Sequence, residues 1–109
     1  MKCAIITACA VGIAHTYMAA EAMERAAKKL DIDVSIETQG SVGIEDQLKP
    51  EYIEEADMVI LATDVRIQKP ERLDGKIVYQ AIPADAIKDA KAVYDKAFAF
   101  YESKKGSAS

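Results

Sequence analysis

The chain has 109 residues, 50% of them hydrophobic, and its formal net charge is −4 at pH 7. This length suits a single domain with its own core, and the acidic balance excludes the basic surface that nucleic-acid binding requires. No apolar run is long enough to span a membrane, and the short apolar start leads into predicted structure rather than a cleavage site, so we expect a cytoplasmic protein without direct membrane insertion.

The first half of the chain alternates between strand and helix patterns. Residues 2–8 form a short apolar run that is typical of a buried strand. Residues 16–30 place small and apolar side chains three and four positions apart, with charged residues between them, which predicts an amphipathic helix. Residues 32–39 alternate apolar and polar side chains and predict a second strand, which a glycine-containing loop at 40–43 follows.

The second half continues this alternation. A short helix is predicted at 49–56, with Pro50 near its start. Residues 58–64 form a continuous apolar strand suited to the middle of a parallel sheet. After an irregular segment at 68–75, residues 76–82 predict a fourth strand.

The last predicted element is a helix over residues 84–104, which Pro83 opens. Residues 105–109 are expected to form a disordered tail. Strands that alternate with helices indicate βαβ units. We therefore predict one α/β domain over residues 1–104, an open four-stranded parallel sheet with flanking helices.

Ligands of such sheets bind beyond the carboxyl ends of the strands. Cys9, Gly40, Asp64 and Pro83 all fall at these ends. The sequence thus collects its loops at the edge where a site is expected.

The connection after the first strand gives the strongest functional signal. Cys9 precedes a helix N-terminus, where backbone N–H groups converge on an anion and favour a thiolate over a thiol. A thiolate in an anion cradle suits attack on a phosphoryl group. Gly12 allows close backbone approach, and His15 or Thr16 is the expected donor to a phosphoryl oxygen. The predicted phosphoryl-binding loop consists of Ala10, Val11, Gly12, Ile13, Ala14, His15 and Thr16.

Plainer interpretations of these residues exist. A free cysteine is often a small buried hydrophobic residue, which we expect of Cys3 in the middle of its strand. Cys3 and Cys9 lie about 20 Å apart along an extended strand, too far for a disulfide. One histidine and two cysteines also make a poor zinc site, so we expect no metal and no cofactor.

The spacing also bears on a phosphatase alternative. A tyrosine-phosphatase-like loop has an arginine six positions after its cysteine, and this sequence has His15 there. Without arginine, the bidentate grip on a phosphoryl group is lost. The spacing therefore favours a phosphoryl carrier over a low-molecular-weight phosphatase or thiol reductase, and a regulatory phosphate-sensing module stays open as a further alternative.

The segment TACAVGIAHTYMAAEAM, residues 7–23, resembles the active-site segment of the fructose-type enzyme IIB domains of the bacterial phosphoenolpyruvate:sugar phosphotransferase system. The family pattern is close to T-A-C-P-T-G-I-A-H-T-x-M-A-A-E. The likeness continues through IETQGSVG at 36–43, EEADMVILATD at 54–64 and ERLDGK at 71–76, where the family usually has R-F-x-G-K. The resemblance covers nearly the whole chain, and the matching segments follow one another in the same order as in the family.

The resemblance implies a protein-phosphocysteine:sugar phosphotransferase. Cys9 would accept a phosphoryl group from phosphohistidine on enzyme IIA and pass it to fructose or a related sugar. The membrane component, enzyme IIC, would hold that sugar, so the chain would act transiently at the inner face of the membrane. Ala10 and Val11 stand where the family commonly has proline and threonine, but neither change removes a backbone amide, so we expect activity to survive.

Four further residues carry secondary expectations. Gln39 is expected either to orient a partner-bearing face or to belong to a structural turn. Asp64 is expected to cap or hydrogen-bond the neighbouring loop. Arg66 and Arg72 are expected either to steer a phosphorylated partner or, as is commoner for surface charges, to be solvated.

Overall fold

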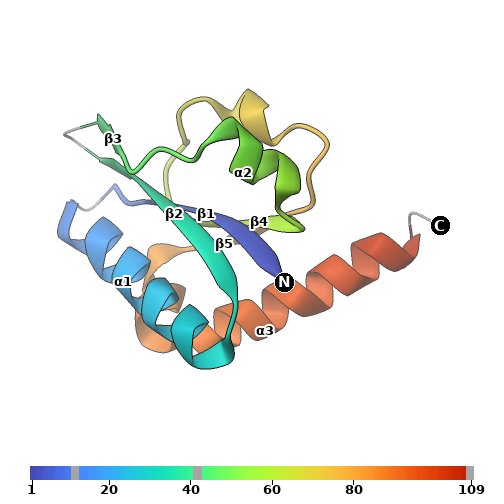
Figure 1. The fold of residues 1–109 in the computed structure, drawn as a ribbon. Helices are drawn as coiled ribbons and strands as arrows, with labels where there is room; N and C mark the ends of the chain where they lie inside the picture. Colours follow the sequence, from blue (N-terminus) through green and yellow to red (C-terminus); the bar gives the residue numbers. More distant parts are fainter. Residues whose placement is uncertain (11–12, 41–42, 108–109) are drawn as a thin grey trace.

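The computed structural model describes residues 1–10, 13–40 and 43–107 (Figure 1). Its elements in chain order are β1 (Lys2–Ala8), α1 (Ile13–Leu30), β2 (Asp33–Gly40), β3 (Gly43–Glu45), α2 (Pro50–Glu55), β4 (Met58–Thr63), the 3₁₀-helix η1 (Pro70–Leu73), β5 (Val78–Ala81) and α3 (Pro83–Ser107). The predicted α/β class is confirmed.

The sheet has five strands in the order β3-β2-β1-β4-β5. β2, β1, β4 and β5 run parallel, whereas β3 pairs antiparallel with the end of β2. The predicted four-stranded, all-parallel sheet is therefore corrected by one edge strand. That strand covers only Gly43–Glu45, which is too short for an alternating pattern to reveal. Gly43 has a φ of 100°, a backbone conformation that favours glycine.

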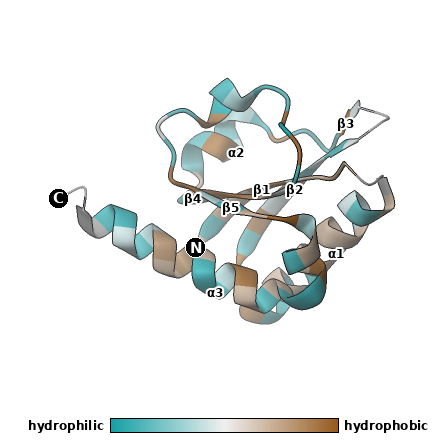
Figure 2. Cartoon of the chain, turned by 180° about the vertical axis from the view of Figure 1, so that it is seen from behind, coloured by the Kyte–Doolittle hydropathy of each residue, from teal (hydrophilic) through white to brown (hydrophobic). Residues whose placement is uncertain are grey.

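Helices cover both faces of the sheet. Figure 1 shows α1 and α3 on one face and α2 with η1 on the other. Along β1, Cys3 and Ile5 belong to the core under α1 and α3, while Ala4 and Ile6 belong to the core under α2. A strand buried on both faces has no polar face, which explains the continuous apolar run (Figure 2).

The start of α1 and the end of α3 differ most from the predicted helix boundaries. α1 begins at Ile13 rather than at residue 16, so His15 and Thr16 lie in its first turn. α3 continues to Ser107, past the expected end at 104 and into the segment assigned to the tail. Within the described residues, no helix combines the length and the apolar character needed to cross a bilayer.

A kink interrupts α3 at Asp89, which has φ −161° and ψ 87°. The Asp89 carboxylate accepts a hydrogen bond from the Ala92 backbone N–H at 3.1 Å and so caps the second helical segment. Beyond this kink, the buried Tyr94 hydroxyl donates to the Met23 carbonyl of α1 at 2.7 Å. This bond fixes α3 against α1 on the face of the sheet that they share.

Candidate functional site

The candidate site residues meet at the point where the strand order of the sheet reverses. From β1 the chain crosses through α1 to β2 on one side, and β4 lies on the other side of β1. Ala8 and Thr63, the last residues of β1 and β4, are register partners. Cys9 and Asp64 follow them directly and therefore lie side by side. Such a switch point is where open α/β sheets bind ligands.

The Cys9 sulfur lies between a carboxylate and an imidazole. Its Sγ donates to Asp64 Oδ2 at 3.3 Å, and His15 Nδ1 lies 3.9 Å from the same sulfur. The other oxygen, Asp64 Oδ1, accepts the Ala10 backbone N–H at 2.8 Å. The Asp64 backbone N–H donates to the Ala8 carbonyl at 3.2 Å. These bonds fix the carboxylate against the start of the loop.

The contact between Cys9 and Asp64 bears on the charge that the sequence predicts for the sulfur. The sequence favours a thiolate at Cys9, because a helix N-terminus follows it. A thiolate and a carboxylate 3.3 Å apart would repel each other, so this contact joins a thiol donor to a carboxylate acceptor. The sulfur itself is half-buried at the edge of the sheet, and a thiolate at Cys9 stays a prediction from the sequence.

A hollow of about 380 Å³ opens in front of the sulfur. It is lined by Cys9, His15, Asp64, Pro83, Ala84, Ile87 and Lys88. The start of α3 therefore contributes to the site, a contribution that the sequence indicated only through Pro83 at a strand end. The lining residues include the cation Lys88 but no arginine. Among the residues that the structure describes, no group of His, Cys, Asp or Glu side chains is placed to hold a metal ion.

The first turn of α1 presents two polar side chains. His15 is exposed beside the sulfur, whereas Thr16 is 1% exposed. Thr7 of β1 donates its hydroxyl to the Thr16 carbonyl at 3.1 Å. The Thr16 hydroxyl itself has no hydrogen-bond partner in the described part of the chain. Buried polar atoms are rarely left unpaired, so this hydroxyl has hydrogen-bonding capacity to offer.

The rest of the predicted loop is described in part. Ala10 and Ala14 are exposed, and Ile13 opens the helix. Val11 and Gly12 lie outside the described residues.

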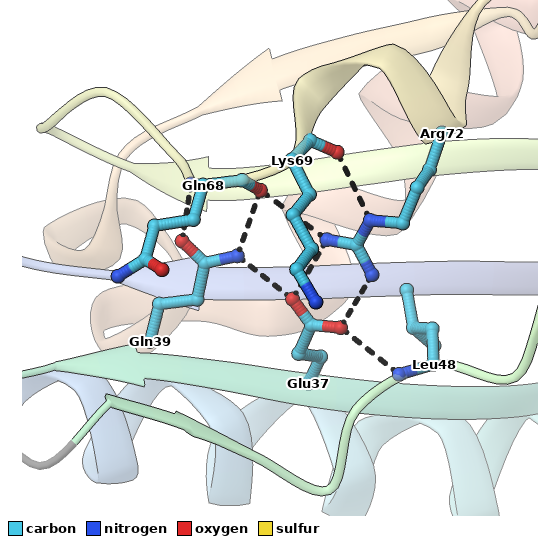
Figure 3. Close-up of polar contacts among 6 residues, drawn as sticks. All are labelled: Glu37, Gln39, Leu48, Gln68, Lys69 and Arg72. Carbon is cyan, nitrogen blue, oxygen red and sulfur yellow. Dashed lines mark hydrogen bonds and ion pairs between the residues drawn. The ribbon is translucent and has the colours of Figure 1, made fainter.

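Gln39 lies at the same edge, in another set of contacts (Figure 3). Its backbone is paired in register with Ala8, but its side chain holds the connection between β4 and β5. Gln39 Oε1 accepts the Gln68 N–H at 2.7 Å, and its Nε2 donates to the Gln68 carbonyl at 3.3 Å. The same Nε2 donates to Glu37 Oε2 at 2.7 Å. The structure therefore does not bring the Gln39 side chain into the hollow.

Glu37 and Arg72 form the centre of this second cluster. Arg72 Nη1 and Nη2 donate to the two Glu37 oxygens at 2.8 and 3.0 Å, and the Leu48 backbone N–H adds a bond of 2.9 Å. Arg72 Nε donates to the Lys69 carbonyl at 2.9 Å (Figure 3). Burial alone raises the pKa of Glu37, but the hydrogen bonds from Arg72, Gln39 and Leu48 outweigh it and bring the pKa below its ordinary value.

These contacts correct the expectation for Arg72, which is a partner of a fully buried carboxylate rather than a solvated charge. No local pattern in the sequence marks Glu37 as a buried residue. Its position in an alternating strand indicates the polar, solvated face, and only α2 and η1, which pack over that face, bury it.

Comparison with known families gives one consistent match. The family model described as "PTS system, Lactose/Cellobiose specific IIB subunit" matches residues 4–96. The "PTS system fructose-like EIIB component 2" of Escherichia coli strain K12 is 48% identical over 95 residues, which cover 87% of this chain and 90% of that protein. The name of the family model and the name of the relative specify the same subunit, but they specify different sugars.

Longer relatives and solved structures agree. The "PTS system fructose-specific EIIB'BC component" of Xanthomonas campestris is 47% identical over 94 residues, 86% of this chain but only 16% of that protein. A domain of a fructose-specific IIABC component from Borrelia burgdorferi superposes with a TM-score of 0.83 at 43% identity, covering 89% of this chain and 92% of that one. The resemblance stated from the sequence is thereby confirmed.

Proposed function

Because the chain belongs to the enzyme IIB family of the phosphoenolpyruvate:sugar phosphotransferase system, as a phosphoryl-transfer component of the fructose type, we propose that Cys9 is the residue that carries the phosphoryl group. The observation that supports this assignment best is the position of the sulfur. It faces a hollow at the switch point of the sheet, with the first turn of α1 and the start of α3 beside it.

The donor in this proposal is a phosphohistidine of enzyme IIA. The Cys9 sulfur attacks phosphorus, an S–P bond forms, and the donor N–P bond breaks with its electron pair on the imidazole nitrogen. The thiol proton ends on that nitrogen, so the transfer needs no further acid or base. Asp64 orients the thiol through the hydrogen bond that it accepts at 3.3 Å.

The phosphoryl oxygens need hydrogen-bond donors as charge shifts onto them. Backbone N–H groups at the start of α1 have no partner within the helix and suit this role. Side-chain donors come from His15, which lies beside the sulfur, and from the Thr16 hydroxyl, which has no partner among the described residues. Lys88 contributes a positive charge at the rim of the hollow.

The acceptor is fructose or a related sugar held by enzyme IIC at the inner face of the membrane. The name of the Xanthomonas relative joins B and C components in one chain. Apolar side chains are exposed near the same edge, Tyr17 and Met18 on α1, Val65 after β4 and Ile82 after β5. They offer a contact surface on which enzyme IIA and enzyme IIC bind in turn.

The phosphatase, thiol-reductase and phosphate-sensing alternatives are not favoured, because the matching relatives are named as phosphotransferase-system components. The test is incubation with phosphoenolpyruvate, the general phosphotransferase proteins and a fructose-type enzyme IIA, followed by mass measurement and peptide mapping. We expect one phosphoryl group on Cys9. Hydrolysis of an aryl phosphate without any transfer from enzyme IIA would overturn the proposal.

A further inference from the structure

The position of Asp64 raises a question that the transfer chemistry does not answer. A phosphoryl group on Cys9 carries negative charge, and the shorter of the two polar side-chain contacts of the sulfur, 3.3 Å, is to a carboxylate. Asp64 is the sole carboxylate among the residues that line the hollow, and the other titratable groups there are His15 from α1 and Lys88 from α3. A carboxylate is an unexpected neighbour for an anion site.

The carboxylate is not free to turn away. Its Oδ1 accepts the Ala10 N–H at 2.8 Å, and the Asp64 backbone N–H is bound to Ala8 at 3.2 Å. Turning Oδ2 away from the sulfur breaks the Ala10 bond, which comes from the residue next to Cys9. These two bonds hold the carboxylate charge beside the sulfur in this structure.

We propose that the Asp64 carboxylate opposes negative charge on Cys9, and so destabilises the phosphocysteine and favours passage of the phosphoryl group to the next acceptor. This inference rests on the proposed function of Cys9. In the loading step the S–P bond forms, the N–P bond breaks, and the thiol proton ends on the donor imidazole. Asp64 thus begins and ends the step as a carboxylate beside a dianionic phosphoryl group.

The expected size of the effect follows from Coulomb's law. Asp64 is exposed, so solvent screens its charge, and the interaction at this separation changes the loading equilibrium by about tenfold rather than by several orders of magnitude. A phosphoryl carrier needs a phosphocysteine that forms readily and also gives up its phosphoryl group readily. A modest electrostatic penalty meets that requirement without removing the nucleophile.

Two substitutions separate charge from structure. Asp64→Asn keeps an oxygen that accepts the Ala10 N–H and replaces the carboxylate charge by a neutral amide. Asp64→Ala removes both the charge and the acceptor. If Asp64 only holds the loop, Asp64→Asn behaves as the unchanged protein does and Asp64→Ala does not. If the charge matters, Asp64→Asn differs from the unchanged protein in how readily negative charge or a phosphoryl group is carried on Cys9.

The first measurement is the equilibrium distribution of phosphoryl groups between a phosphorylated fructose-type enzyme IIA and this chain, at low and at high salt. We expect Asp64→Asn to shift the distribution about tenfold toward phosphocysteine, and we expect salt to reduce the difference, because screening weakens a charge effect and not a loop-holding effect. Equal distributions for both proteins at both salt concentrations would overturn the inference.

The second measurement needs no phosphoryl donor. The rate of iodoacetamide alkylation of Cys9 reports how readily negative charge forms on the sulfur, and we expect Asp64→Asn to react several-fold faster near neutral pH. An unchanged alkylation rate counts against the inference. Faster alkylation of a chain that enzyme IIA never phosphorylates would instead retain the charge effect and reject the proposed function. Thermal unfolding of both variants verifies that they are folded.

Discussion

Two polar clusters join distant parts of this chain, and they differ in how completely their hydrogen bonds are satisfied. In the Glu37–Arg72 cluster, Glu37 is fully buried and both its oxygens accept bonds of 2.7 to 3.0 Å. In the Cys9 cluster, His15 and Asp64 are exposed and the contacts to the sulfur are 3.3 and 3.9 Å. The Glu37 carboxylate accepts four hydrogen bonds, whereas the Cys9 sulfur faces an open hollow.

This difference separates groups that hold the fold from groups that can react. A buried, fully bonded ion pair is costly to break, because removing one partner leaves a charge without compensation. A half-exposed thiol with weak partners is able to exchange those partners for a substrate. We therefore expect changes in the Glu37–Arg72 cluster to alter stability and changes around Cys9 to alter transfer.

The largest expected effect is that of Cys9→Ser. A serine hydroxyl stays protonated at neutral pH and is a much weaker nucleophile, so we expect phosphoryl transfer from enzyme IIA to be abolished. Mass measurement of the variant after incubation with phosphorylated enzyme IIA tests whether phosphoryl transfer is lost. Thermal unfolding should be nearly unchanged, because the site is at an open edge. Label that persists on the variant would show that the acceptor lies elsewhere.

The next effect is on stability. Arg72→Met leaves Glu37 buried without its ion-pair partner, and we expect a loss of about 3 kcal/mol in the free energy of unfolding, measured with urea. Glu37→Gln/Arg72→Met is the matched control, because it removes the uncompensated charge and keeps an acceptor for the Leu48 N–H. The double variant should be more stable than Arg72→Met. If Arg72→Met and the unchanged protein have the same free energy of unfolding, the Glu37–Arg72 ion pair contributes nothing to stability.

The pH dependence of stability tests the same pair. Burial raises the pKa of Glu37, but hydrogen bonds outweigh this and hold the pKa below its ordinary value of 4.5. The unfolded chain then binds the proton more tightly, so the contribution to stability is complete above that value and is lost as the pH falls through the lower folded pKa. In urea titrations, the difference between the unchanged protein and Glu37→Gln should shrink in acid. A difference that stays constant down to strongly acidic pH would contradict this.

A smaller effect is expected for His15. Loss of one donor that acts mainly in the transition state commonly costs about 10²-fold in rate, so we expect His15→Gln to slow transfer by that order. His15→Asn places its amide nitrogen closer to the position of Nδ1, the atom 3.9 Å from the sulfur, and should retain more of the rate. The label should remain on Cys9 in both variants. Phosphate mapped to His15 would overturn the mechanism.

The smallest expected effect is that of Cys3→Ala. Cys3 is fully buried in β1, and burial raises the pKa of its thiol to about 12, so it stays protonated. We expect a loss of about 1–2 kcal/mol in stability and no loss of transfer. Iodoacetamide should label only Cys9 of the two cysteines in the folded protein. Loss of transfer in folded Cys3→Ala would place Cys3 in the site.

The sequence by itself determined the α/β class, the parallel strands and the residues that follow them. Periodicity encodes these features locally, because a strand buried on both faces must be apolar throughout and an amphipathic helix must repeat every three to four residues. The same reasoning placed Cys9 and Asp64 at one edge. Recognition of the family added the chemistry, since a single cysteine before a helix is only a modest signal.

Only the tertiary structure decided which side chains touch. β3 is too short to have a pattern, and it becomes a strand by pairing with Thr38–Gly40. The ion pair of Glu37 and Arg72 joins residues far apart in the chain, and the face of β2 that seemed polar is buried by α2 and η1. The contact of Cys9 with Asp64 arises because β1 and β4 are neighbours in register. Such contacts depend on strand order, and strand order is set by packing that no local pattern encodes.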